Sequence, residues 1–178
     1  MIAGHFAFAA AVRSREKSAP MWALMLASQW LDVVFVPLFI AGVETMRPAP
    51  GAPRGYGEGI FHIPWTHSLL GAAVLAVVFA IPSAFAWGRR AALVLGGVVL
   101  SHWVLDAVVH RRDLPLLPGG PPVAGFGLWR NPPAAAAVEL GLVIAGSVLY
   151  ARSIRSRLPA LAVFASGAIT LALNYAGF

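Results

Sequence analysis

Cysteine is absent from this chain of 178 residues, and charged residues make up only 11% of it. The lack of cysteine excludes disulfides, thiolate metal sites and cysteine-ligated iron–sulfur clusters, so His, Asp and Glu would have to hold any metal. No Gly-x-Ser-x-Gly motif occurs, which argues against a serine hydrolase. The net charge is +6, but the basic residues stand in short clusters between apolar runs. We therefore expect no nucleic-acid partner.

Apolar residues are abundant instead, at 59% of the chain, and they come in long runs. A helix needs about 20 such residues to cross the hydrocarbon core of a bilayer. Five runs are long enough: 21–43, 66–87, 91–110, 133–151 and 159–177. The shorter apolar segment at the start predicts a half-length helix or a segment tucked into the bundle. We expect an all-α fold, a polytopic membrane helical bundle of about five transmembrane helices in a single domain, 1–178, with the lipid bilayer as its main partner.

Two loops, 44–65 and 111–132, are rich in Pro and Gly and should not be regular helix. The five spans place both loops on one side of the membrane. More Lys and Arg residues lie on the other side, so the positive-inside rule predicts that the two loops are periplasmic, in a bacterial cytoplasmic (inner) membrane. Pro37 and Pro82 fall inside spans and predict kinks.

Ionisable residues gather in the membrane half next to these loops. His102, Asp106 and His110 stand four residues apart, so they climb one helix face in steps of about 6 Å. Buried ionisable groups are costly in a membrane and usually have partners or line a wet cavity. The predicted topology brings further groups to the same layer. The candidate metal ligands are His5, Asp32, His67, His102, Asp106 and His110.

Imidazole and carboxylate ligands together favour a divalent metal, above all zinc, with manganese or iron as alternatives. His102, Asp106 and His110 form a ladder of three residues on one helix face, and its two ends, His102 and His110, are separated by about 12 Å. We therefore expect Asp106 to bridge two ions, with His102 on one and His110 on the other. A buried network of His and acid pairs that carries protons without metal is the alternative. His67 could also be a hydrogen-bonded core histidine, and Asn174 is expected to make a hydrogen bond between helices.

These residues lie in motifs that resemble a group of bacterial integral membrane proteins, and the resemblance covers most of the chain. The matching pieces include Gly4-His5-Phe6, Thr66-His-Ser-Leu-Leu70, Ser101-His-Trp-Val-Leu-Asp106 and His110-Arg-Arg-Asp-Leu-Pro. The Thr-His-Ser and Ser-His-x-x-x-Asp pieces are similar to YdjM-like membrane-bound metal-dependent hydrolases. Around Asp32 the chain departs from that pattern, because those proteins tend to have a denser cluster of Asp and His there.

The resemblance and the residues together predict a metal-dependent hydrolase acting on a lipid or other phosphoester from the outer half of the bilayer. Glu139 or Asp113 would be the general base. Arg111, Arg112 and Arg130 would hold a phosphate group, because guanidinium matches phosphate in a bidentate manner.

Non-enzymatic interpretations stay open. The chain could be a small accessory subunit of a larger respiratory, photosynthetic or transport complex, with other membrane-protein subunits as partners and a structural His/Asp cluster. A haem held by two histidines and a transporter with a protonatable centre are further alternatives.

Overall fold

The computed structural model describes residues 1–51 and 59–176. The chain is mostly helical, and two small two-stranded sheets correct the all-α prediction. The helices are α1 (Ile2–Arg15), α2 (Met21–Ser28), α3 (Trp30–Ile40), α4 (Leu69–Val109), α5 (Pro132–Ser153) and α6 (Leu158–Ala176). The strands are β1 (Thr45–Pro48), β2 (Gly59–His62), β3 (Leu114–Pro115) and β4 (Pro122–Ala124), and a 3₁₀ turn covers Leu128–Arg130.

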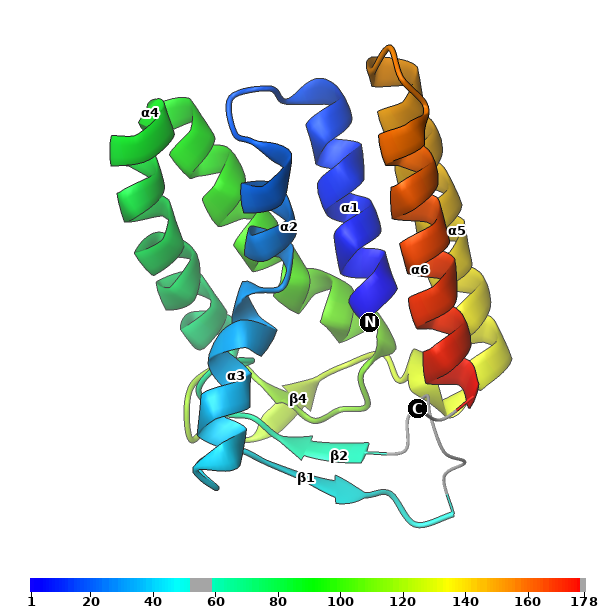
Figure 1. Cartoon of the computed structure of the whole chain (residues 1–178). Helices are drawn as coiled ribbons and strands as arrows, with labels where there is room; N and C mark the ends of the chain where they lie inside the picture. Colours follow the sequence, from blue (N-terminus) through cyan, green and yellow to red (C-terminus); the bar gives the residue numbers. More distant parts are fainter. Residues whose placement is uncertain (52–58, 177–178) are drawn as a thin grey trace.

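The helix α1 lies inside the bundle and packs against α2, α5 and α6 (Figure 1). Its 14 residues make it too short to cross a bilayer, which agrees with the half-length helix predicted from the sequence. A Cβ atom added at Gly146 of α5 would collide with the backbone oxygen of Ala7. The two helix backbones therefore touch directly, and only glycine permits this approach.

The first predicted span is broken. Helices α2 and α3 are bent by 48° relative to each other, and together they are long and apolar enough to cross a membrane. The break lies at Gln29, whose backbone is not helical (φ −111°, ψ 8°), and not at Pro37 within α3. The bend brings the first turn of α3, with Asp32, toward the start of α1, where the Gln29 side chain hydrogen-bonds to the Ile2 carbonyl.

The helix α4 contains the second and third predicted spans as two segments. Gly88 interrupts it with φ 84° and ψ 170°, a backbone conformation that favours glycine. The chain turns back on itself there, and the two halves of α4 lie side by side (Figure 1). Ser68 caps the start of the first half by accepting a hydrogen bond from the Gly71 backbone N–H at 3.0 Å.

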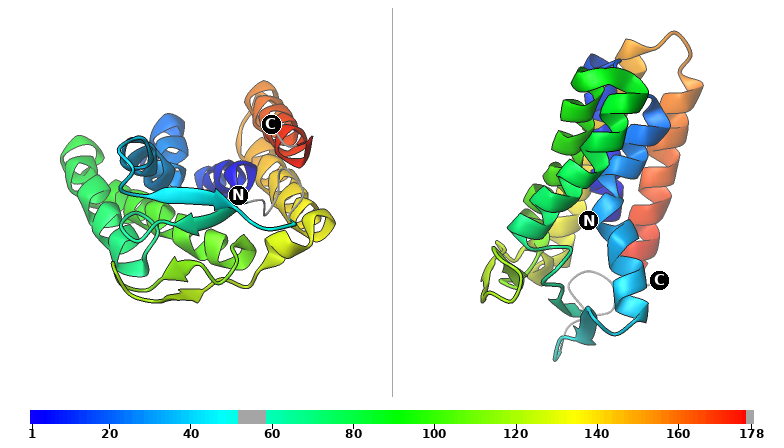
Figure 2. Two further views of the ribbon diagram at one scale, coloured as in Figure 1. Left: turned by 90° about the horizontal axis from the view of Figure 1, so that it is seen from below. Right: turned by 90° about the vertical axis from the view of Figure 1, so that its left-hand side faces the viewer.

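The two Pro/Gly loops form antiparallel hairpins, β1 with β2 and β3 with β4. Both hairpins lie at one end of the bundle, beyond the ends of most helices (Figures 1 and 2). The prediction that the loops share one side is thus confirmed within the described residues. Proline stands in β1, β3 and β4, where it limits the hydrogen-bonded pairing of the strands to a few residues.

Large apolar side chains cover the outside of the helices, with Phe85, Ile40 and Leu158 at least 74% exposed. Three helices, α4, α5 and α6, are long and apolar enough to cross a membrane, and the bent pair α2 and α3 adds a fourth candidate. An apolar exterior of this kind suits a lipid bilayer.

Candidate metal centre

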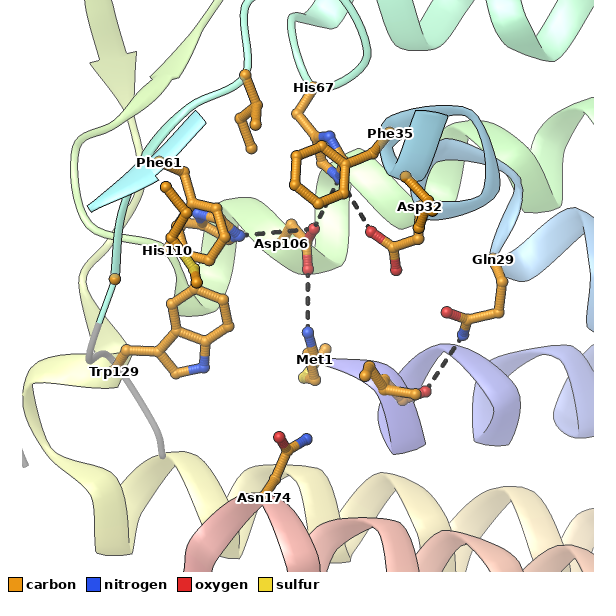
Figure 3. Close-up of a pocket in the computed structure, with 15 residues that line it drawn as sticks. Met1, Gln29, Asp32, Phe35, Phe61, His67, Asp106, His110, Trp129 and Asn174 are labelled. Carbon is orange, nitrogen blue, oxygen red and sulfur yellow. Dashed lines mark hydrogen bonds and ion pairs between the residues drawn. The ribbon is translucent and has the colours of Figure 1, made fainter. Parts of the chain in front are cut away.

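The six predicted metal ligands lie in one cluster near the hairpin end of the bundle. They come from α1, α3, the segment before α4, and the second half of α4. Five of them are buried, and the side chain of Asp32 is 37% exposed. Figure 3 shows Asp32, His67, Asp106 and His110 turned toward a common point. The sequence prediction that these residues share one layer agrees with this geometry.

Asp106 is at the centre of the cluster. Its Oδ2 lies 3.1 Å from His102 Nε2, and 3.7 Å from the Nε2 atoms of both His67 and His110. Its Oδ1 lies 3.0 Å from His5 Nε2. All four imidazoles thus present the same ring nitrogen to one carboxylate.

Asp32 forms the second carboxylate of the cluster. Its Oδ1 lies 3.4 Å from His67 Nε2, and its Oδ2 lies 3.7 Å from His102 Nε2. Asp32 stands in the first turn of α3, directly after the bend at Gln29. A single carboxylate at this place therefore serves two histidines.

His102 is oriented by a backbone carbonyl. Its Nδ1 lies 2.8 Å from the Ser28 carbonyl oxygen, and because a carbonyl only accepts, Nδ1 carries the proton. The Nε2 of the neutral ring then has a lone pair, and this buried atom makes no hydrogen bond with the described residues. His5 stacks on the same ring, with centroids 3.7 Å apart and planes 11° from parallel.

His67 is oriented by a buried relay. Thr66 Oγ1 donates to Glu44 Oε2 at 2.6 Å, so its oxygen can only accept from His67 Nδ1, 2.7 Å away. Glu44 has no exposed surface, and it also accepts the backbone N–H groups of Trp65 and Thr66, at 2.8 and 2.9 Å. The proton of His67 is therefore fixed on Nδ1, and the lone pair of Nε2 faces the two aspartates.

His110 is also oriented by an acceptor that fixes its proton on Nδ1. Its Nδ1 donates to Asp113 Oδ1 at 3.0 Å, and Asp113 Oδ2 accepts the backbone N–H of Phe61 at 3.3 Å. His110 is the C-cap of α4 with an extended backbone (φ −58°, ψ 150°), so its ring turns back toward Asp106. This is why both ends of the ladder approach one carboxylate oxygen, although the helix rise alone separates them.

The donor set fits a divalent metal ion. Two ligand atoms bound to one ion at about 2.1 Å in a tetrahedral arrangement lie about 3.4 Å apart. The nitrogen–oxygen separations in the cluster run from 3.0 to 3.7 Å. Two groups of three residues have one ligand atom each within 4.8 Å of the other two, one of His5, His102 and Asp106 and one of Asp32, His67 and His102. Histidine ligands whose other ring nitrogen donates to a carbonyl or carboxylate are also typical of protein metal sites.

The other predicted residues lie outside this centre. Glu139 is fully buried and accepts the Gly4 backbone N–H at 2.9 Å, which ties α5 to α1. Asp113 holds His110, as described above. Arg112 and Arg130 are exposed and Arg111 is half-buried, and none of the three is among the described residues that line the cavity beside the cluster.

Sequence reasoning missed three supporting residues: Ser28, Glu44 and Thr66. Ser28 acts through its carbonyl oxygen, which no side-chain pattern reveals. Thr66 precedes a helix and resembles a cap in the sequence, as Ser68 does, whereas the structure gives the cap to Ser68. Glu44 is the one whose isolation in an apolar stretch before a Pro/Gly loop could have marked it, since a lone acid there needs a buried partner.

The fold and the cluster together define a class: a helical protein suited to a membrane, with a buried histidine–carboxylate site that can hold a divalent ion. Comparison of the chain with protein-family models, curated proteins and solved structures gave no match. The assignment of function therefore depends on the geometry of this chain.

Proposed function

We propose that this chain is a membrane-embedded, metal-dependent hydrolase that acts on a lipid or phosphoester from one half of the bilayer. The observation that carries the proposal is the convergence of His67, His102 and His110. Each has its Nδ1 proton fixed by an acceptor, and each points its Nε2 at Asp106. Lone pairs facing carboxylate oxygens repel one another unless a proton or a metal ion lies between them, and one metal ion can bind several of these atoms at once.

Zinc is the metal we favour, because imidazole and carboxylate are its common ligands in catalytic sites. Its charge would offset the two aspartates, which are otherwise expensive to bury in a membrane. His5, His102 and Asp106 would hold one ion. His102 offers a single lone pair, so a second ion would have to be held by other residues of the cluster: Asp32, His67 and Asp106.

A bound divalent ion would lower the pKa of a water molecule and polarise an ester or phosphoester oxygen. The protein residues supply the rest. Asp32 lines the cavity and is the most exposed carboxylate of the cluster, so it is positioned to accept a proton from water. Asp113 holds His110 through its hydrogen bond to Nδ1, and Glu139 holds α1 by accepting the Gly4 backbone N–H.

The proposed arrangement in the membrane has five spans, with the two halves of α4 counted separately and α1 inserted as a half-length helix. The two hairpins would lie on the periplasmic side of a bacterial inner membrane. The motif resemblance to YdjM-like membrane hydrolases supports the proposed hydrolase activity.

Elemental analysis of tag-free, detergent-purified protein tests the proposal. We expect stoichiometric zinc in the wild type, its loss in His102→Ala, and its retention in His62→Ala, which removes an exposed histidine outside the cluster. Hydrolysis of ester and phosphoester probes should disappear with the metal and return when zinc is added back to the wild type. Metal-free, folded wild type would contradict the proposal.

A further inference from the structure

A cavity of about 410 Å³ lies beside the histidine–carboxylate cluster. Figure 3 shows the cluster on one side of it and Trp129 and Phe61 next to His110. The cluster residues that line it are Asp32, His67, Asp106 and His110. Its remaining wall is mainly apolar and includes Phe35, Ile63 and Trp129. The volume lies in the usual range of small-molecule pockets, from about 300 to 1,000 Å³.

The mouth of the cavity is apolar. Ile2 at the start of α1, Val36 of α3 and Met46 of β1 line the cavity and are also 41%, 51% and 42% exposed. Residues that contribute to both the lining and the outer surface mark where a pocket opens. In a protein whose exterior suits lipid, a mouth of this composition admits hydrocarbon chains and disfavours strongly hydrated solutes.

No Lys or Arg is among the described residues that line this cavity. Arg47 and Arg112 line a separate hollow at the two hairpins. The N-terminal ammonium of Met1 does line the cavity, but it lies 3.4 Å from Asp106 Oδ1 and is paired with that carboxylate. Sites that recognise phosphate groups usually supply guanidinium or ammonium groups. The described lining offers no guanidinium, and its one ammonium is already paired, which favours an uncharged substrate.

Two neutral amides complete the lining, those of Gln29 and Asn174. Asn174 of α6 points into the cavity from the side opposite the cluster (Figure 3). The expected hydrogen bond between helices is not formed, since the side chain of Asn174 makes no hydrogen bond with any described residue. Gln29 Nε2 donates one hydrogen bond to the Ile2 carbonyl at 3.3 Å. An unpartnered amide facing a cavity can bind a polar group of a ligand.

We propose that the cavity binds an uncharged acyl lipid that enters from the bilayer, with its hydrocarbon chain against the apolar wall and its carboxylic ester group at the cluster. Asn174 would hydrogen-bond the alcohol part of this lipid. The reaction step rests on the proposed function: the oxygen of water bonds to the carbonyl carbon, the ester C–O bond breaks, and the two protons of water end on the acid and the alcohol. Lipid binding itself does not require the metal.

The test measures quenching of Trp129 fluorescence by a dibromostearate methyl ester in detergent micelles, with the bromine-free ester as competitor. Subtracting the signal of Trp129→Phe isolates this tryptophan from the others. We expect saturable quenching in the wild type, and an affinity lower by about tenfold or more in Val36→Phe, which fills the cavity from α3. Dibromo-octadecyl phosphate should bind about tenfold more weakly than the ester.

A matched control is Val78→Phe, which adds the same ring at an exposed position of α4 away from the cavity. It should leave quenching unchanged. Asn174→Ala should weaken binding of a monoacylglycerol, with a free alcohol group, more than binding of the methyl ester. Equal quenching in Val36→Phe and the wild type, or tighter binding of the phosphate, would overturn the inference. The measurement is repeated on metal-free protein, so that it tests lipid binding independently of the metal. A wild-type protein that binds the ester but binds no zinc would refute the proposed function and leave this inference intact.

Discussion

Replacing Glu44 by Gln tests whether the cluster is built for a metal, because this change reverses one hydrogen bond without changing side-chain size. In the wild type Glu44 Oε2 accepts from Thr66, whose oxygen then accepts from His67 Nδ1. Glu44 Oε1 is fixed by two backbone N–H groups and must stay an acceptor. The amide nitrogen that Glu44→Gln introduces would therefore stand at the place of Oε2 and donate to Thr66. The Thr66 hydroxyl proton would turn to His67 Nδ1, and the His67 proton would move to Nε2.

The expected loss follows from this change of tautomer. A protonated Nε2 has no lone pair for a metal, so His67 stops being a ligand. Changes to residues that orient metal-bound histidines cost about 10-fold to 100-fold in affinity. This corresponds to about 1.4 to 2.8 kcal/mol of binding free energy. The stability of the metal-free protein should change less, because every buried polar atom of the relay keeps a partner.

Zinc affinity is measured by competition with a chromophoric chelator, and thermal unfolding is followed on metal-free protein. Thr66→Ser keeps the hydroxyl and should bind zinc like the wild type. Thr66→Val removes the hydroxyl and should lose affinity as Glu44→Gln does. Wild-type zinc affinity in a folded Glu44→Gln variant would refute the reasoning, since the relay would then have no influence on the cluster.

Three further predictions concern the bundle and its ends. Gly146→Ala should lower the free energy of unfolding by about 1 to 3 kcal/mol, because its methyl group would collide with the Ala7 carbonyl, and denaturant unfolding in micelles would show it. The Ser18 backbone N–H and Arg90 hold the pKa of Glu16 at about 2, below its usual 4.5. Its stabilising contribution is thus present above pH 4.5 and is lost as the pH falls toward 2, so the difference in melting temperature between wild type and Glu16→Gln should shrink over that window. Removing the metal with a chelator should lower the melting temperature of the wild type but not that of His102→Ala, because only a bound ligand stabilises by mass action; an equal shift in both would contradict the site.

Much of the fold follows from the length of the apolar runs. They predicted the half-length first helix, the loops on one side and the spans that α4, α5 and α6 provide. The break at Gln29 has no comparable signal, since it stands within an apolar run without Pro or Gly at that position. Short hairpins in loops of Pro and Gly were missed because their register depends on packing against the helix ends, which a local pattern does not encode.

The candidate ligands were predictable because each is an ionisable group in an apolar segment, and the cost of burying such a group demands a partner. Their orientation was not predictable. The acceptor for His102 is a backbone carbonyl, and the relay to His67 begins at Glu44, more than twenty residues earlier in the chain. The position of His110 depends on an extended C-cap, whereas the ladder argument assumed a helix through this residue.

X-ray absorption at the zinc edge tests the central claim most directly, because it reports which atoms surround the ion. We predict a first shell of nitrogen and oxygen at about 2.0 to 2.1 Å, with the outer-shell scattering of at least two imidazole rings. His102→Ala should lose this signal, while His62→Ala should retain it. A zinc shell of oxygen alone, unchanged by His102→Ala, would show that the ion binds elsewhere and that the cluster is a structural network.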